Sequence, residues 1–300
     1  MPSLSARAVR RVLRATVKPG DVDPDLVDVI RSATDGRPPP TIPVRGVSRR
    51  RIHPGELAGV TGERTSVATP RRTIVHLHGG YHVGGGPGLY RNLAARLAHR
   101  LDAEVLVLDL PLAPEHPYPA ALSHAWTAYE ALIERADLTP TSVALSGDSA
   151  GGGLALAIAQ RAVDGQAPSP GALVLLSPWL DLTGTASSLD RNDERDDMLS
   201  AAALRGAAAL YAGTALDDPG VSPLHGTFTG LPPSVVTVDA SETLLEDALR
   251  FADLARSAGS RVELHRTEGL FHIWPVLVPF VREARRTVAE VGGFLDRTLT

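Results

Sequence analysis

The part of the sequence that decides the fold is Val143-Ala144-Leu145-Ser146-Gly147-Asp148-Ser149-Ala150-Gly151-Gly152-Gly153-Leu154-Ala155-Leu156. It runs from a short apolar segment, through a serine flanked by glycines, into an alanine-rich run. Its centre, from Gly147 to Gly151, fits the Gly-x-Ser-x-Gly pattern of a nucleophilic serine on a tight turn between a strand and a helix. Such a turn strains the backbone, and only small neighbours fit around it. The stretch therefore predicts Ser149 as a nucleophile, against the alternative of a chance serine in a glycine-rich turn.

The composition is that of an ordinary globular protein of 300 residues, with 43% hydrophobic and 21% charged residues. The formal net charge of −4 offers no strongly basic patch, so we expect no nucleic-acid partner. The chain has no cysteine, which excludes disulfides, thiolate catalysis and cysteine-bound metals.

The first 18 residues carry arginines at positions 7, 10, 11 and 14 and lack the continuous apolar core of a signal peptide. The sequence also has no apolar run long enough to cross a membrane. We therefore expect a cytoplasmic protein without a stable membrane anchor.

The rest of the chain alternates apolar strands with helices, which predicts an α/β protein with a mostly parallel sheet covered on both faces. An exposed hairpin over 46–52 and 56–67 precedes this pattern. The interval between 177 and 234, almost sixty residues without a strand and with a helical run over 200–211, is expected to sit above the sheet as an insertion. The predicted strands are 73–78, 104–109, 142–146, 172–176, 235–238 and 262–266, and the predicted helices are 89–101, 120–135, 151–163, 244–258 and 276–295.

A serine nucleophile needs a histidine base, and three histidines follow Ser149 in the chain. His225 lies in the interval between strands, and His265 lies inside the last strand, where its side chain is held against the sheet. His272 lies in the loop after that strand, at the sheet edge where the serine turn also lies. We therefore predict His272 as the base; the alternative is a loop histidine satisfied by solvent.

The base in turn needs an orienting acid just past the strand 235–238. Glu246 and Asp247 already belong to the following helix and are expected to point away. Asp239 stands at the strand end and Glu242 in the loop, and position alone leaves these two open.

The loop after the first central strand, beginning His78-Gly79-Gly80, is suited to binding an oxyanion because glycine lets backbone N–H groups approach it closely. A phosphate-binding loop is the alternative. The glycines at 84–86 lack the spacing of a dinucleotide fingerprint, and no Gly-Lys-Ser/Thr follows them.

Taken together, these motifs resemble those of the hormone-sensitive-lipase-like family of bacterial esterases, which have the α/β-hydrolase fold. The matching pieces lie along residues 74–275 in the order of the family. They are His78-Gly79-Gly80, Ala113-Pro114-Glu115-His116-Pro117-Tyr118-Pro119-Ala120-Ala121, Gly147-Asp148-Ser149-Ala150-Gly151-Gly152, Ser177-Pro178-Trp179-Leu180-Asp181-Leu182, Glu242-Thr243-Leu244-Leu245-Glu246-Asp247 and Phe271-His272.

The resemblance implies Ser149 as nucleophile, His272 as base and Glu242 as acid, although the family usually has aspartate at the acid position. It also implies that the N–H groups of Gly80, Tyr81 and Ala150 bind the oxyanion, with His78, Gly79 and Asp148 as supporting motif residues.

Further, the resemblance implies one domain over 1–300 with an eight-stranded sheet and a small helical cap from residues 1–40 and 180–225. A family glycine or alanine is Tyr81 here, so a positive φ at this position would be costly. Two consequences stay open: a distorted oxyanion hole, or an acyl pocket narrowed by the side chain.

The implied activity is hydrolysis of short- to medium-chain carboxylic esters of small molecules, without metal or organic cofactor. Acyl transfer to an alcohol, hydrolysis of N-acyl or formyl amides, and a non-catalytic ligand-binding role remain alternatives, and a homodimer is possible. The candidate pocket residues, for which core packing is an equal alternative, are Tyr81, Trp179, Leu180, Tyr211, Phe228 and Trp274.

Overall fold

A computed structural model describes residues 2–18, 26–34 and 38–300, and its strands form one eight-stranded sheet in the order β1-β2-β4-β3-β5-β6-β7-β8. The strands from β3 to β8 pair in parallel, whereas β2 runs antiparallel to both β1 and β4. The strands are β1 (Ser48–Ile52), β2 (Gly62–Ser66), β3 (Arg72–Leu77), β4 (Ala103–Leu108), β5 (Val143–Asp148), β6 (Ala172–Leu176), β7 (Ser234–Asp239) and β8 (Val262–Thr267).

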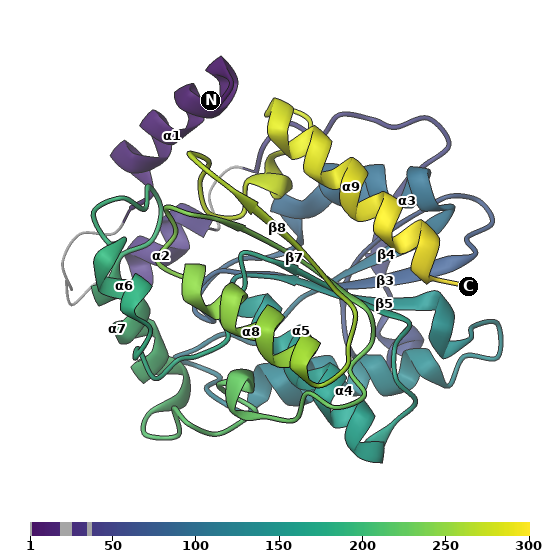
Figure 1. The fold of residues 1–300 in the computed structure, drawn as a ribbon. Helices are drawn as coiled ribbons and strands as arrows, with labels where there is room; N and C mark the ends of the chain where they lie inside the picture. The colour runs from purple at the N-terminus through teal and green to yellow at the C-terminus, as the bar shows by residue number, and fades with distance from the viewer. Residues whose placement is uncertain (1, 19–25, 35–37) are drawn as a thin grey trace.

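Helices cover both faces of this sheet, with α3 and α9 on one face and α4, α5 and α8 on the other (Figure 1). The helices are α1 (Leu4–Thr16), α2 (Leu26–Thr34), α3 (Arg91–Leu101), α4 (Ala120–Ile133), α5 (Ala150–Arg161), α6 (Ser187–Arg191), α7 (Ala201–Ala212), α8 (Leu245–Ser257) and α9 (Arg282–Thr298).

The central strands are apolar on both sides because each face packs against a helix layer. In β5, the side chains of Val143 and Leu145 join the core under α4, α5 and α8, while Ala144 joins the core under α3 and α9. The predicted α/β architecture is thus confirmed, with a mostly parallel eight-stranded sheet covered by helices on both faces.

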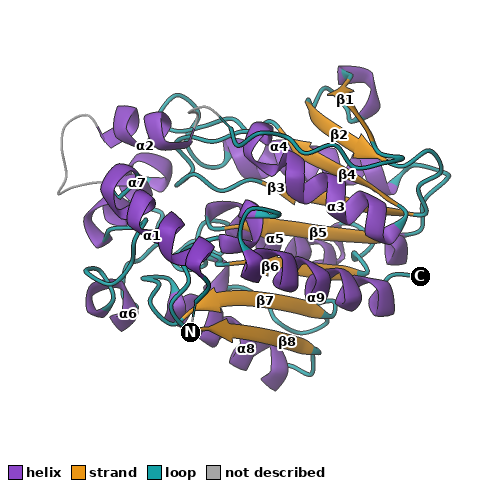
Figure 2. Cartoon of the chain, turned by 90° about the horizontal axis from the view of Figure 1, so that it is seen from above, coloured by secondary structure: helices purple, strands orange, loops and turns teal. Residues whose placement is uncertain are grey.

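The helices α1, α2, α6 and α7 gather at the end of the sheet toward which β7 and β8 point (Figure 2). They come from the segments 1–40 and 180–225, which we predicted to form a cap. Positions 1, 19–25 and 35–37 of that prediction lie outside the described residues. The cap helices therefore stand over the carboxyl ends of the strands, where ligands bind in open α/β sheets.

One predicted helix begins later than expected. The start of the segment predicted as mostly helical from 276 instead consists of a 3₁₀ turn over Trp274–Leu277 and a further turn over 278–281, and α9 begins only at Arg282. Pro279 explains the break, because proline lacks the N–H that a continuous helix would need there.

Candidate active site

Ser149 stands on the predicted sharp turn between β5 and α5. Its backbone has φ 50° and ψ −125°, a region that non-glycine residues rarely adopt. Two glycines make room for the turn: a Cβ atom on Gly147 would lie 2.1 Å from the carbonyl oxygen of Gly151, and one on Gly151 would lie 2.0 Å from that of Leu77. The Gly-x-Ser-x-Gly pattern is therefore imposed by close backbone contact between β5, α5 and β3.

Backbone hydrogen bonds to the next strand hold this strained turn. The N–H of Ser149 donates to the carbonyl of Leu176 at 3.0 Å, and its own carbonyl accepts from the N–H of Trp179 at 2.9 Å. Because α5 begins at Ala150, the positive end of the helix dipole lies directly beside the serine.

His272 and Glu242, from the loops after β8 and β7, meet in the interior. Nδ1 of His272 lies 2.6 Å from Oε2 of Glu242, and both side chains are buried. Burial by itself lowers the pKa of His272, but the hydrogen bond and the charge of Glu242 outweigh it and raise that pKa above its ordinary value. The contact directs Nδ1 toward the acid, which leaves Nε2 to act as the proton acceptor.

Ser177, at the end of β6, links this acid to the histidine loop. Its hydroxyl donates to Oε1 of Glu242 at 2.9 Å and accepts from the N–H of Ile273 at 3.2 Å. The N–H of Asp239 also donates to Oε1 of Glu242, at 2.7 Å. The role of Ser177 was not predicted, although the residue lies in one of the motifs, because nothing in the motif indicates which loops its hydroxyl joins.

Asp239, the other candidate acid, serves as a brace between the two loops. Its Oδ1 accepts from the N–H and hydroxyl of Ser241 and from the N–H of Gly269, and its Oδ2 accepts from Thr267 Oγ1 and the N–H of Leu270. The geometry thus gives the contact with His272 to Glu242 and gives Asp239 a positioning role.

The two acidic residues inside α8 point elsewhere, as expected. Glu246 accepts from the N–H and hydroxyl of Ser187. The buried carboxylate of Asp247 accepts from the N–H groups of Leu180 and Asp181, at 2.7 and 3.0 Å.

The glycine-rich loop after β3 supplies free backbone donors. Gly80 has φ 124° and Tyr81 has φ 60°. Within the part of the chain that the structure describes, the N–H groups of Gly80 and Tyr81 donate to no other group. The positive φ of Tyr81, which we predicted to be costly, is therefore present, and it accompanies two unpaired donors beside Ser149.

A buried network around Asp148 fixes the same loop. Its Oδ1 lies 3.1 Å from the N–H of Gly79 and 3.1 Å from Nε2 of His76, while its Oδ2 accepts from the hydroxyl of Tyr90 at 3.0 Å. His78, buried beside it, has Nδ1 2.9 Å from the carbonyl of Gly79, and burial lowers its pKa. The supporting motif residues therefore hold the loop in place.

The serine, the histidine and the loop open onto one cavity of about 80 Å³. Its lining combines the polar groups with apolar side chains from α2 and from the segment before α7. It is lined by Val17, Ile30, Ala33, Thr34, Gly79, Gly80, Tyr81, Gly85, Gly86, Leu89, Tyr90, Asp148, Ser149, Met198, Leu199, His272 and Ile273.

Comparisons with known proteins agree with this geometry. The model of a family described as having the alpha/beta hydrolase fold matches residues 74–276. The chain belongs to the α/β-hydrolase family. An esterase of Acinetobacter venetianus is 37% identical over 246 residues, 81% of each chain, and an acetyl-hydrolase of Streptomyces hygroscopicus is 40% identical over 230 residues, 76% of each chain.

Solved structures place it within the hormone-sensitive-lipase-like branch of that family. A crystal structure of an esterase from the bacterial hormone-sensitive lipase family matches with a TM-score of 0.88 and 30% identity over 100% of both chains. EstE5, in a crystal soaked with p-nitrophenyl butyrate, matches with a TM-score of 0.88 and 29% identity over 98% of both chains.

In this α/β hydrolase, the aromatic candidates for the pocket divide into two groups. Tyr81 lines the cavity, whereas the other candidates do not appear in its lining. The indole N–H of Trp274 donates to Thr287 at 3.1 Å in the core under α9, and Phe228 packs against Phe251 of α8 at a ring distance of 6.1 Å. These are core packing positions, the alternative that the sequence left open.

Tyr211, Trp179 and Leu180 lie around the cap rather than in the cavity. Tyr211 of α7 stacks on His82 with ring centroids 3.8 Å apart, and the ring of Trp179 lies 6.0 Å from that of His82. Leu180 is fully buried in the core under the cap. The stack joins α7 to the loop that carries Gly80 and Tyr81.

The two remaining histidines stand away from the serine. His225 lies 3.6 Å from Asp181, and His265 lies 3.2 Å from Glu290 of α9. Only His272 of the three candidates lines the cavity with Ser149.

Among the described residues, no group of three or more His, Asp or Glu side chains is arranged to hold a metal ion. Within the same residues, none of the helices has the length and apolarity needed to cross a membrane.

Proposed function

We propose that this α/β hydrolase is a serine carboxylesterase that cleaves short-chain acyl esters through Ser149, His272 and Glu242. The observation that carries the proposal is the 2.6 Å contact between Glu242 and His272, made beside the one described cavity that also exposes Ser149 and the unpaired N–H groups of Gly80 and Tyr81. Nucleophile, base, acid and oxyanion donors are the complete set that acyl transfer through a serine requires.

In the acylation step, Oγ of Ser149 attacks the ester carbonyl while Nε2 of His272 takes its proton. The carboxylate of Glu242 holds the imidazole in the productive tautomer and stabilises its charged form. The N–H groups of Gly80, Tyr81 and Ala150 stabilise the negative oxygen of the tetrahedral intermediate. The intermediate collapses as the alcohol leaves with the proton from His272, and an acyl-enzyme remains.

Deacylation repeats the same steps with water. His272 takes a proton from the water as its oxygen attacks the acyl carbonyl, and the second intermediate expels Ser149, which recovers its proton. The free acid is released and the enzyme returns to its starting state. This chemistry requires no metal and no cofactor.

The size of the cavity supports a short acyl group. An engineered apolar cavity of about 150 Å³ in another protein holds benzene, and the cavity beside Ser149 has about 80 Å³. A relative named an acetyl-hydrolase and a structural neighbour soaked with p-nitrophenyl butyrate point the same way. We therefore propose acetyl to butyryl esters as the preferred substrates.

Hydrolysis of p-nitrophenyl acetate, butyrate, octanoate and laurate tests the proposal. We expect the acetate and butyrate to turn over fastest, and Ser149→Ala to lower the rate by about 10⁴-fold or more. Ser123→Ala, which removes an exposed hydroxyl from α4, is the matched control and should keep the rate. Turnover that survives in Ser149→Ala would refute the proposal, and no turnover of any ester by the wild type would favour a ligand-binding role.

The same assay separates hydrolysis from its nearest alternatives. Added short alcohols would appear in new esters if the acyl-enzyme prefers an alcohol to water, and N-acetyl and N-formyl anilides would report on amide cleavage. We expect free acid as the main product and slow cleavage of the amides.

A further inference from the structure

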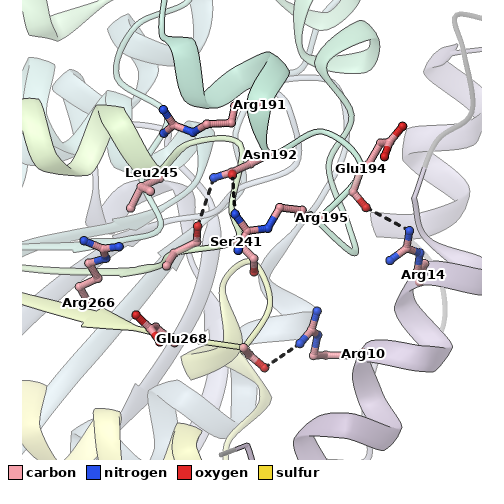
Figure 3. Close-up of a pocket in the computed structure, with 12 residues that line it drawn as sticks. Arg10, Arg14, Arg191, Asn192, Glu194, Arg195, Ser241, Leu245, Arg266 and Glu268 are labelled. Atoms are coloured by element: carbon pink, nitrogen blue, oxygen red, sulfur yellow. Dashed lines mark hydrogen bonds between the residues drawn. The ribbon is translucent and has the colours of Figure 1, made fainter.

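A second, larger depression lies outside the catalytic cavity. It has a volume of about 640 Å³ and lies between α1, the end of α6 and its following turn, and the loops after β7 and β8 (Figure 3). None of the described residues that line it also lines the catalytic cavity. The residues of this groove are Arg10, Arg14, Arg191, Asn192, Glu194, Arg195, Ala240, Ser241, Leu245, Arg266, Glu268 and Gly269.

Arginine dominates its lining, with five arginines against two glutamates. Arg10 and Arg14 are partly neutralised by Asp197. Arg191 lies 3.6 Å from Glu246. Within the described residues, Arg195 and Arg266 form no ion pair. Because like charges repel one another, an anion bound between these side chains would lower their mutual repulsion.

The arginines approach the groove from different elements. Arg191 and Arg195 come from the cap and Arg266 from the end of β8 (Figure 3). The planar guanidinium group forms paired hydrogen bonds with phosphate and carboxylate oxygens. Arg195 and Arg266, which have no carboxylate partner among the described residues, together with the paired Arg191, suit a ligand with more than one anionic group.

The floor of the groove consists of the loops that carry the proposed catalytic residues. Ala240 and Ser241 immediately precede Glu242, and Gly269 leads to His272. Asn192 of the groove donates to the carbonyls of Ala240 and Glu242, at 3.2 and 2.8 Å. A ligand in the groove therefore contacts the backbone support of the acid, and one that binds better to a particular loop arrangement would change turnover.

We propose that this groove binds a small soluble anion with two or more phosphate groups, and that its binding changes the rate of ester hydrolysis. The effect on rate rests on the proposed esterase function, whereas the binding does not. Phosphate groups are also presented by anionic lipid surfaces, and the test separates these two sources.

Binding is measured first, by titration calorimetry of the Ser149→Ala protein with tripolyphosphate at low ionic strength. We expect saturable binding that weakens with salt and that falls at least tenfold in Arg195→Gln/Arg266→Gln. Both arginines are exposed, so the variant should fold normally, which its melting temperature checks. The control Arg45→Gln/Arg71→Gln removes the same charge from exposed positions outside the groove and should bind as before.

Three results would overturn the binding proposal. They are the absence of binding, equal weakening in both double variants, and arginine-dependent binding to phosphatidic acid vesicles without binding to tripolyphosphate.

The effect of binding on ester hydrolysis is then tested with proteins that retain Ser149. Turnover of p-nitrophenyl acetate is measured with and without tripolyphosphate. A change in kcat/KM that is lost in Arg195→Gln/Arg266→Gln supports the proposed effect on the rate. Binding of tripolyphosphate without any change in kcat/KM refutes it.

Discussion

Oε2 of Glu242 lies 2.6 Å from Nδ1 of His272 in a position where both side chains are buried. This contact determines how the proposed reaction depends on pH. Burial lowers the pKa of His272, and the hydrogen bond and charge of Glu242 raise it by more, so the pKa lies above its ordinary value of 6.5. Only neutral imidazole accepts the serine proton, so the rate should rise with pH through a midpoint above 6.5.

Replacing the acid should change this pH profile as well as the rate. In Glu242→Gln the carboxylate hydrogen bond and the charge of Glu242, the two largest contributions that raise the pKa of His272, are lost. Burial still lowers this pKa and only the smaller contributions of Asp196 and Asp148 still raise it, so the midpoint moves to lower pH. We expect the plateau of kcat/KM to fall by up to about 10⁴-fold, because the tautomer is no longer imposed. The measurement is the pH–rate profile with p-nitrophenyl acetate.

Glu246→Gln is the control for this change, since it removes the same charge from α8 outside the cavity. It should leave both midpoint and plateau in place. A Glu242→Gln profile with the wild-type midpoint would show that another group sets the ionisation.

Asp239 should respond differently, because it supports both loops. Its carboxylate accepts five hydrogen bonds from Ser241, Gly269, Leu270 and Thr267. An amide at this position turns an NH₂ group toward some of these donors and leaves them unpaired, at a cost of about 1–3 kcal/mol for each unpaired group. Asp239→Asn should therefore lower the melting temperature by several degrees, while the midpoint of the pH–rate profile stays near that of the wild type.

Thermal unfolding and pH–rate profiles of Asp239→Asn and Glu242→Gln together decide between the two acids. If Asp239→Asn moved the midpoint to lower pH with little loss of stability, Asp239 and not Glu242 would orient the base.

Tyr81 should limit the length of the acyl group. It lines the cavity and holds φ at 60°, a conformation that costs a non-glycine residue about 1–3 kcal/mol. Tyr81→Gly removes both the ring and the strain, and Tyr81→Ala removes only the ring. Both variants should shift the preference from acetate and butyrate toward octanoate, and the glycine variant should be the more stable of the two by about 1 kcal/mol.

Chain-length profiles and chemical denaturation measure these two effects separately. An unchanged preference in both variants would mean that Tyr81 does not bound the acyl site. Equal stability of the two would mean that its backbone conformation relaxes on substitution.

The sequence was sufficient to predict the sheet and the order of the proposed catalytic residues. Each central strand is a short apolar run bounded by turns. The glycines around Ser149 are required because a Cβ atom at Gly147 or Gly151 would lie about 2 Å from a backbone carbonyl oxygen. Patterns of this kind involve residues that are close together in the sequence, so they can be recognised without the fold. The place of Glu242 beside His272 depends on two loops that come together only in the fold, and position alone had left Asp239 as its equal.

Contacts between distant segments account for what could not be predicted. Trp274 and Phe228 are large apolar side chains near the predicted site, and nothing in their spacing tells a pocket wall from a core. Ser177 stands in a recognised motif, but its partners come from loops 65 and 96 positions further along the chain. The start of the predicted helix at 276 could have been placed better, because Pro279 in the sequence argues against a continuous helix there.

Ser177 should act as a positioning residue for the acid. Its hydroxyl is shared between Glu242 and the backbone of Ile273, so its loss frees the carboxylate to rotate away from His272. One hydrogen bond to a charged group contributes about 1.5–3 kcal/mol, and 1.36 kcal/mol corresponds to tenfold in rate. We therefore expect Ser177→Gly to lower kcat about tenfold to a hundredfold with little change in KM. Glycine is the better probe than alanine because φ at this position is 46°.

Steady-state kinetics across the pH range check this prediction. The midpoint of the pH–rate profile is expected to move toward lower pH, because Glu242 is held less firmly beside His272. A drop in kcat at an unchanged midpoint, accompanied by a large loss of thermal stability, would instead assign Ser177 to the packing of the fold.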